Sequence, residues 1–375
     1  MQPNKFTVPF FDYPAIFARY ETEYMEIIKD VLARGAFIMQ KDLEEFETRL
    51  ANYLGTKHAI GTADGTLALL TGLQAVGVER GDEVILPSHT FVATAAAVYH
   101  IGAKPMLADC GTDHLIDPDS VESLISPKTR VLMPVQLNGR TADMDRLVAL
   151  AEHHGLQIVE DACQGLGSKY KGKLAGTFGA AGAFSFYPSK TLGCFGDGGA
   201  LVTNDNSIAR KVRLLRDHGR NDAGEIECFG FNARLDNIQA AILDYNLKNY
   251  QEIVERRRHI ARMYRQLLSD LEELVLPPGP DNDPDNFDVY QNYEVEAENR
   301  DELKTYLAEK RVGTLIQWGG KAIHQFKGLR LGEFLLPNTE KLFQRALMLP
   351  MHQNLSNEQV YYICECVNEF YQKKI

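Results

Sequence analysis

Short apolar runs alternate with stretches of helical periodicity between about residues 56 and 205. The apolar runs predict buried strands, and the stretches between them predict helices. Asp117 followed by Pro118 is a typical helix start. The predicted strands are Val84–Leu86, Pro105–Ala108, Arg130–Val135, Gln157–Val159, Ala183–Phe186 and Ala200–Thr203, and the predicted helices are Gly65–Val76, Thr90–Tyr99, Pro118–Leu124, Met144–His153 and Ser207–Asp217.

This strand–helix alternation is typical of an α/β fold. It predicts a mostly parallel central sheet with helices on both faces. Sheets of this kind bind ligands beyond the carboxyl ends of their strands. We therefore expect the chemistry of the chain to lie at that edge.

The remainder of the chain predicts a second unit. Residues 232–272 read as one or two long helices, and a loop rich in Pro, Asp and Asn follows at Leu276–Asn286. The rhythm then restarts, with strands at Tyr290–Ala297 and Thr314–Gln317, a helix at Arg300–Lys310, and a final helix from Asn357 to about Tyr371. Because 375 residues exceed what one core usually serves, we predict a large domain over residues 1–245 and a smaller C-terminal α/β domain over residues 246–375.

Charge and composition exclude several classes of protein. The formal net charge is -11 with both signs interspersed, which argues against a nucleic-acid partner, because phosphate contacts need a basic patch. Neither a leader-like apolar region nor an apolar run of membrane-spanning length is evident. The six cysteines form no CxxC pair, so we expect no metal site and reduced thiols in a cytoplasmic protein.

The stretch FSFYPSKTLGCFGDGGA, from Phe184 to Ala200, places Lys190 between an apolar run and a glycine-rich loop. A P-loop is excluded, because Phe184 and Ser189 occupy the positions of its glycines. No GxGxxG fingerprint follows a strand here. Two readings of Lys190 remain: a Schiff-base lysine, made nucleophilic by desolvation in a walled pocket, or a solvated surface charge.

Three other stretches bear on this choice. Asp161 and Gln164 follow a buried strand in IVEDACQG, where a carboxylate could pair with a pyridine nitrogen or cap a helix. Gly65 and Thr66 open a helix in ADGTLALL and offer a phosphate site or a plain cap. Phe91 in SHTFVAT could stack on a flat ring or belong to the core. Together these groups supply the parts of a pyridoxal phosphate site.

The chain resembles the sugar-nucleotide aminotransferases of the DegT/DnrJ/EryC1/StrS family, within the fold-type I pyridoxal phosphate enzymes. The resemblance runs from about Phe6 to the C-terminus and rests on the stretches above together with GDEVILPSHTFVAT, RDHGR and GFNARLDNIQAAIL. It implies that Lys190 binds the cofactor covalently and that Asp161 faces its pyridine nitrogen. It also implies that Gln164 lies beside the ring hydroxyl, that Phe91 stacks on the ring, and that the phosphate is held by Gly65, Thr66 and Ser185. Asn232, which we predict at the start of a long helix, would reach the phosphate of the cofactor in the neighbouring subunit.

Three segments depart from the family pattern. The chain has QLNGR at Gln136–Arg140 where HLYGQ is common, IQWGG at Ile316–Gly320 where IHYP is common, and no glycine at Met39–Gln40. Trp318 and Lys321 lie in or beside the second of these segments. Both are candidates for substrate contact, with ordinary packing or solvation as the alternative.

The resemblance implies a homodimer with shared active sites. It also implies amine transfer from an amino acid, with L-glutamate as the expected donor, to a keto group of a nucleotide-linked sugar. The alternatives are a sugar dehydratase of the same family, in which a histidine replaces the lysine, and a non-catalytic pyridoxal-phosphate-binding regulator. The nucleotide (dTDP, UDP or GDP), the keto position (C3 or C4) and the final sugar stay open.

Overall fold

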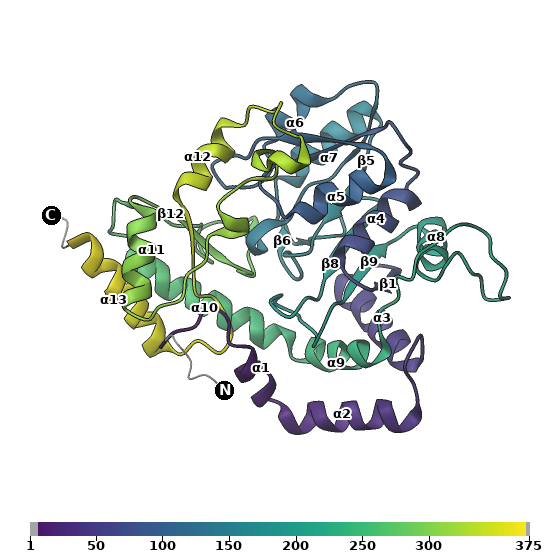
Figure 1. Ribbon diagram of the computed structural model, residues 1–375, viewed down its shortest axis with the longest axis horizontal. Coiled ribbons are helices and arrows are strands. Elements are labelled where there is room, and N and C mark those ends of the chain that lie inside the picture. Colours follow the sequence, from purple (N-terminus) through teal and green to yellow (C-terminus); the bar gives the residue numbers. More distant parts are fainter. Residues whose placement is uncertain (1–6, 373–375) are drawn as a thin grey trace.

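The computed structural model describes residues 7–372. Its central sheet has seven strands in the order β1-β9-β8-β5-β4-β2-β3 (Figure 1). The five strands β8, β5, β4, β2 and β3 are parallel, and β9 runs antiparallel to both of its neighbours. The mostly parallel sheet expected from the sequence is confirmed. The strands are β1 (His58–Thr62), β2 (Glu83–Pro87), β3 (Lys104–Ala108), β4 (Thr129–Leu132), β5 (Gln157–Asp161), β8 (Ala181–Ser185) and β9 (Gly199–Thr203).

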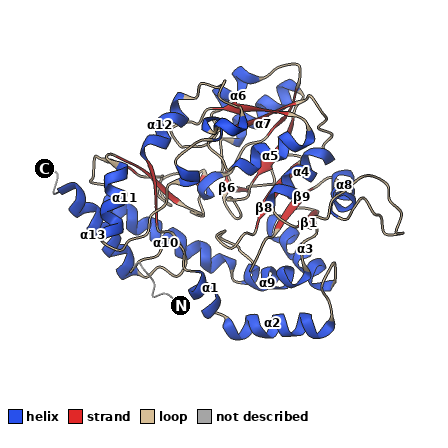
Figure 2. Cartoon of the chain, in the orientation of Figure 1, coloured by secondary structure: helices blue, strands red, loops and turns tan. Residues whose placement is uncertain are grey.

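Helices cover both faces of this sheet (Figure 2). One face packs on α4 (Gly65–Ala75), α5 (Val92–Ile101) and α8 (Asn206–Arg216). The other packs on α3 (Lys41–Leu54), α6 (Pro118–Leu124), α7 (Met144–His154) and α9 (Asn237–Lys248). Side chains alternate between the two cores along each strand, as Ala183 and Phe184 do in β8.

A second core lies beyond the sheet, around an antiparallel sheet in the order β10-β12-β13. Helices α10, α11 and α13 complete this second core. Helix α10 contributes to both cores, because its Val254 packs in the core of the large sheet and its Ile260 packs in the second core. A boundary at residues 245 and 246 stays a prediction. The elements are α10 (Tyr250–Leu268), β10 (Leu274–Val275), β12 (Tyr293–Ala297), α11 (Arg300–Glu309), α12 (Pro337–Arg345), β13 (Ala346–Leu349) and α13 (Asn357–Gln372).

The predicted strand at Thr314–Gln317 is wrong. Leu315 forms only an isolated bridge to Met348, and the chain then turns through a short 3-10 segment, Gln317–Gly319, with Trp318 at a φ of 48°. The strand that pairs with β12 is β13. Strand β1 and the helices α1 (Tyr13–Ala18), α2 (Glu21–Arg34), α3 and α12 were not predicted.

A small three-stranded sheet joins β6 (Lys169–Tyr170) and β7 (Lys173–Leu174) to β11 (Asn286–Phe287). It connects the segment after β5 with the loop that precedes β12. Within residues 7–372, no helix is both long enough and apolar enough to cross a bilayer.

Candidate active site

The predicted site residues converge at the carboxyl ends of the parallel strands. Asp161 ends β5, Ser185 ends β8, and Lys190 follows in the loop after β8. Gly65 begins α4, and Phe91 directly precedes α5. Parallel strands deliver these segments to one edge of the sheet, which is where open α/β sheets bind their ligands.

Asp161 is buried and held at both carboxylate oxygens. Its Oδ2 accepts a hydrogen bond from Thr94 Oγ1 at 2.7 Å, and its Oδ1 accepts one from the Cys163 N–H at 3.2 Å. Thr94 in turn shares a 2.7 Å hydrogen bond with Thr90. The chain after Asp161 forms turns rather than a helix, so this carboxylate is not a helix cap.

Lys190 lies near this carboxylate in a loop without regular structure. Burial lowers the pKa of its ammonium group, and the nearby Asp161 carboxylate opposes that effect only in part. Burial likewise holds the pKa of the Cys163 thiol well above its ordinary value. A larger fraction of the neutral amine makes Lys190 a better nucleophile than a surface lysine.

The N-terminus of α4 packs tightly against the end of β8. A Cβ on Gly65 would lie 2.8 Å from Cys163 Sγ and 2.9 Å from Ser185 Cβ. On Gly199 it would lie 2.3 Å from the carbonyl carbon of Asp64. These glycines let the N-terminal turn of α4 lie directly beside Ser185.

Phe91 and Gln164 border the same region. The Phe91 side chain is 53% exposed although it lies at the sheet edge. Gln164 Oε1 accepts hydrogen bonds from the Asn138 N–H at 2.9 Å and from Asn292 Nδ2 at 3.2 Å. The core alternative for Phe91 is therefore wrong, and Gln164 is held by residues from two distant segments.

The remaining predicted residues, Asn232, Trp318 and Lys321, belong to other segments of the chain. Asn232 is exposed at the base of the loop between α8 and α9, where it bridges Asp217, and the next residue, Ala233, accepts a hydrogen bond from the Ala63 N–H at 2.9 Å. The placement of Asn232 at a helix start is corrected, because α9 begins at Asn237. Trp318 packs 5.6 Å from the His89 ring and 6.1 Å from the Phe343 ring, and Lys321 is exposed.

The sequence profile of the DegT/DnrJ/EryC1/StrS aminotransferase family matches residues 19–368. The chain belongs to this family. The expected membership is confirmed, and the solved structures below share the fold over nearly their full length.

Two relatives and two solved structures illustrate the similarity. The chain is 39% identical to the dTDP-3-amino-3,4,6-trideoxy-alpha-D-glucose transaminase of Streptomyces venezuelae, covering 98% of this chain and 97% of the relative. It is 37% identical to the pleiotropic regulatory protein of Geobacillus stearothermophilus, covering 97% of this chain and 99% of the relative. The chain shares its fold with the structure of S. venezuelae DesV in complex with a ketimine intermediate, with a TM-score of 0.93 and 39% identity over 97% of this chain and 98% of that one. It also shares its fold with the structure of NtdA from Bacillus subtilis with bound cofactor PMP, with a TM-score of 0.90 and 29% identity over 99% of this chain and 86% of that one.

Sequence reasoning missed several residues that hold the site of this family member. Thr94 was visible in SHTFVAT as a hydroxyl within an apolar helix, three residues after Phe91. Asn138 lies in a segment already marked as a departure, at a φ of 55° that favours glycine or asparagine. The role of Asn292 had no sequence signal, because its contact with Gln164 spans 128 residues.

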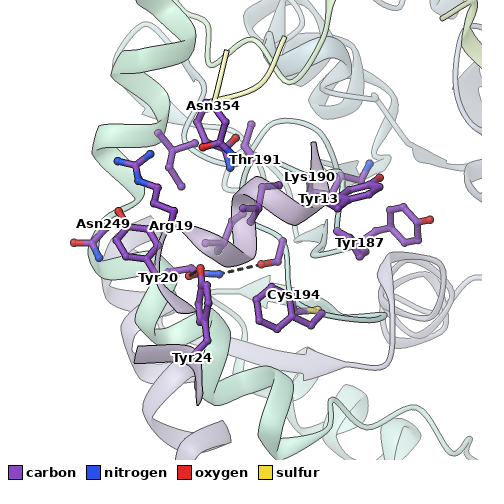
Figure 3. A pocket seen from close by; sticks show the side chains of 18 residues that line it. Tyr13, Arg19, Tyr20, Tyr24, Tyr187, Lys190, Thr191, Cys194, Asn249 and Asn354 are labelled. Atoms are coloured by element: carbon purple, nitrogen blue, oxygen red, sulfur yellow. Dashed lines mark hydrogen bonds between the residues drawn. The ribbon is translucent and has the colours of Figure 1, made fainter. Parts of the chain in front are cut away.

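A cavity of about 330 Å³ lies beside the Lys190 loop. Figure 3 shows its aromatic wall, with Tyr13 from α1, Tyr20 from the turn before α2, Tyr24 from α2 and Tyr187 from the loop. Arg19 and Asn249 add polar groups to the lining. A cavity with apolar walls and few polar groups is typical of a small-molecule site.

Buried charges also join the large sheet to the second core. Glu294 on β12 lies 3.2 Å from His114 Nδ1 and 3.6 Å from His89 Nε2. Burial alone would lower the pKa of His114, but hydrogen bonds to Glu294 and Glu296 outweigh it and raise the pKa to about 9. Burial would raise the pKa of Glu294, but His89 and His114 outweigh it and hold the pKa well below its ordinary value.

Proposed function

We propose that this chain is a pyridoxal-phosphate-dependent aminotransferase acting on a nucleotide-linked keto sugar. The observation that carries the proposal is the juxtaposition of the half-buried Lys190, whose pKa is lowered, with the anchored carboxylate of Asp161. The substrate class is supported by relatives named as dTDP-sugar and UDP-sugar aminotransferases at 34–39% identity. L-Glutamate is the proposed amino donor.

The residues present fit the cofactor. The close approach of Gly65 to Ser185 forms a cradle that a single Cβ would fill, and the start of α4 suits a dianionic phosphate. Phe91 presents an exposed aromatic face at the other end of the region. Thr66 and Ser185 would add hydroxyl donors to the phosphate, Phe91 would stack on the ring, and Gln164 would lie beside the ring hydroxyl.

When bound, pyridoxal phosphate supplies an aldehyde that condenses with an amine with loss of water, and a protonated ring that withdraws electrons from the adjacent carbon. Lys190 provides the amine and later moves a proton between the substrate carbon and the cofactor carbon. Asp161 holds the proton on the pyridine nitrogen. A charge-assisted hydrogen bond of this kind is worth about 1.5–3 kcal/mol.

The proposed assembly is a homodimer in which Asn232 completes the phosphate site of the neighbouring subunit. The exposed position of Asn232 supports this, and Phe229 of the same loop is 101% exposed. Trp318 and Lys321 are proposed to border the sugar pocket. We propose a cytoplasmic enzyme that makes an amino deoxysugar for lipopolysaccharide, another surface polysaccharide or a glycosylated product.

A regulatory role is the second candidate, because the Geobacillus relative is named a pleiotropic regulatory protein. A sugar dehydratase is disfavoured, because the family's dehydratases replace the lysine that Lys190 matches with a histidine. Amine transfer from L-glutamate should be assayed against C3- and C4-keto sugars carrying dTDP, UDP or GDP. Turnover of one of these supports the aminotransferase, whereas cofactor binding without any turnover supports the regulator.

A further inference from the structure

One distant side chain, Gln291, bonds the backbone of the loop that carries Lys190 at two points. Gln291 Oε1 accepts a hydrogen bond from the Thr191 N–H at 2.8 Å, and Gln291 Nε2 donates one to the Ser189 carbonyl at 2.8 Å. Gln291 is only 5% exposed. Its amide therefore bridges the backbone on the two sides of Lys190.

These two bonds fix the peptide groups that flank the Lys190 Cα. The Ser189 carbonyl belongs to the planar peptide before Lys190, and the Thr191 N–H belongs to the planar peptide after it. A third bond, from the Lys190 N–H to the Tyr187 carbonyl at 2.8 Å, holds the first of these planes from its other side. Two fixed planes determine φ and ψ of Lys190, and so the direction in which its side chain leaves the backbone.

The segment that carries Gln291 is itself held firmly. Arg257 of α10 is buried and donates to the Tyr290 carbonyl at 2.9 Å and to the Gln291 carbonyl at 3.2 Å. Gly139 packs against the opposite side, where a Cβ would lie 2.6 Å from the backbone nitrogens of both Tyr290 and Gln291. The amide of Gln291 thus projects from a fixed backbone.

The next residue reaches the other end of the proposed site. Asn292 Nδ2 donates to Gln164 Oε1 at 3.2 Å and to Asn138 Oδ1 at 2.9 Å. Asn138 Oδ1 also accepts from Gln317 Nε2 at 2.7 Å. Adjacent side chains of one segment therefore hold the Lys190 loop and Gln164.

We propose that Gln291 is a positioning residue that sets the reach of Lys190 toward the cofactor, while Asn292 fixes Gln164. This inference rests on the proposed function. It assigns a role to the segment Val289–Asn292, called the bridge segment below, which contributes no group to the chemistry itself.

The test compares two forms of the cofactor. Pyridoxal phosphate links covalently to Lys190, whereas pyridoxamine phosphate does not, so only the first depends on the direction of the lysine. We expect Gln291→Met to weaken pyridoxal phosphate binding about tenfold and pyridoxamine phosphate binding less than about twofold. Asn292→Leu should weaken both forms to a similar extent, because Gln164 would contact the ring in either form.

Gln359→Met is the matched control. Gln359 lies on α13 and its Oε1 accepts a hydrogen bond from the Ser356 N–H at 2.9 Å, so its loss should leave both affinities unchanged. In a Lys190→Ala background, Gln291→Met should have no further effect on either affinity. If Gln291→Met does not fold, the isosteric Gln291→Glu, which keeps the acceptor but not the donor, is tested by the same comparison.

Equal weakening of both cofactor forms by the Gln291 variant would overturn the inference, as would unchanged pyridoxal phosphate affinity. Both results leave the proposed function standing. A wild-type protein that does not bind pyridoxal phosphate through Lys190 would overturn the proposed function instead.

Discussion

The carboxyl edge of the central sheet and the bridge segment hold the proposed site in different ways. At the sheet edge, Asp161 and Ser185 are the last residues of their strands, and Gly65 is the first of its helix. In the bridge segment, Gln291 and Asn292 act through side-chain amides on loops that are distant in sequence. The first region places groups that would react, and the second orients them.

This difference predicts two kinds of mutational effect. Removing a group at the sheet edge removes a chemical step, so the loss is large and the fold is retained. Removing a group in or around the bridge segment leaves every reacting group present but less well directed, so the loss is smaller. The predictions below run from the largest effect on activity to the smallest.

Lys190→Ala should lower kcat by more than about 10³-fold, because both the covalent link and the proton transfer are lost. Binding of pyridoxamine phosphate should persist, because the contacts proposed for Asp161, Phe91 and the α4 N-terminus remain. Turnover and absorbance titration measure the two effects. Turnover within tenfold of the wild type would place the chemistry elsewhere.

Asp161→Asn should lower kcat about 10- to 100-fold, because an amide cannot hold the pyridine proton by charge. Thr94→Val keeps the shape but removes the donor to Asp161 Oδ2. We expect a smaller loss, about three- to tenfold, for that variant. Near-normal kcat in Asp161→Asn, with cofactor bound, would show that the carboxylate only organises its loop.

Asn232→Ala should weaken cofactor affinity about tenfold without unfolding the subunit, because one amide donor to the phosphate is lost. Mixing it with Lys190→Ala tests whether the site is shared between subunits. In a shared site, a heterodimer has one site with both native residues and one with both lesions, so part of the activity should return.

If Asn232 and Lys190 act within one chain, every heterodimer site keeps one defect. Mixing would then restore nothing, and the shared site would be disproved. The comparison requires that subunits exchange and that Lys190→Ala is inactive by itself. Full activity in a monomer would contradict the proposed assembly directly.

His114→Gln should change stability more than turnover. His114 faces Glu294, Glu296 and His89, and its pKa is raised to about 9. It therefore adds up to about 3 kcal/mol below its ordinary pKa of ~6.5, and this contribution disappears as the pH rises through 9. Glu294 has a lowered pKa, so its contribution is present above ~4.5 and is lost in acid.

The stabilisation by this pair should thus be greatest between about pH 4.5 and 6.5. Denaturant unfolding at pH 6.5 and pH 9.5 should show a smaller decrease in unfolding free energy for His114→Gln than for the wild type. If the unfolding free energy decreased by the same amount between these pH values in both proteins, His114 would not titrate against Glu294.

The sheet edge could be predicted from sequence because local order determines it. Asp161 lies just past the predicted strand Gln157–Val159, and Ser185 lies near the end of the predicted strand Ala183–Phe186; parallel strands bring such ends to one edge. The partner of Asp161 could not be found in this way. Thr94 lies in the first turns of α5, where a hydroxyl gives no sign of which carboxylate it meets.

The bridge segment could not be predicted, because the contacts of Gln291 and Asn292 with the proposed site join residues 100 to 154 positions apart. The wrong strand at Thr314–Gln317 has a related cause. Its apolar and β-branched residues favour a strand, but the left-handed backbone of Trp318 ends any pairing after one bridge. Met39 likewise adopts a φ of 48°, within the Met39–Gln40 segment where the resemblance implies a glycine.

The covalent role of Lys190 is the central claim, and reduction of the bound cofactor tests it most directly. Borohydride should fix pyridoxal phosphate to the lysine that holds it, and peptide mapping identifies that residue. We expect the label on the peptide that contains Lys190 and its absence from the same peptide of Lys190→Arg. Labelling of Lys169, Lys171 or Lys173 in place of Lys190 would contradict the account.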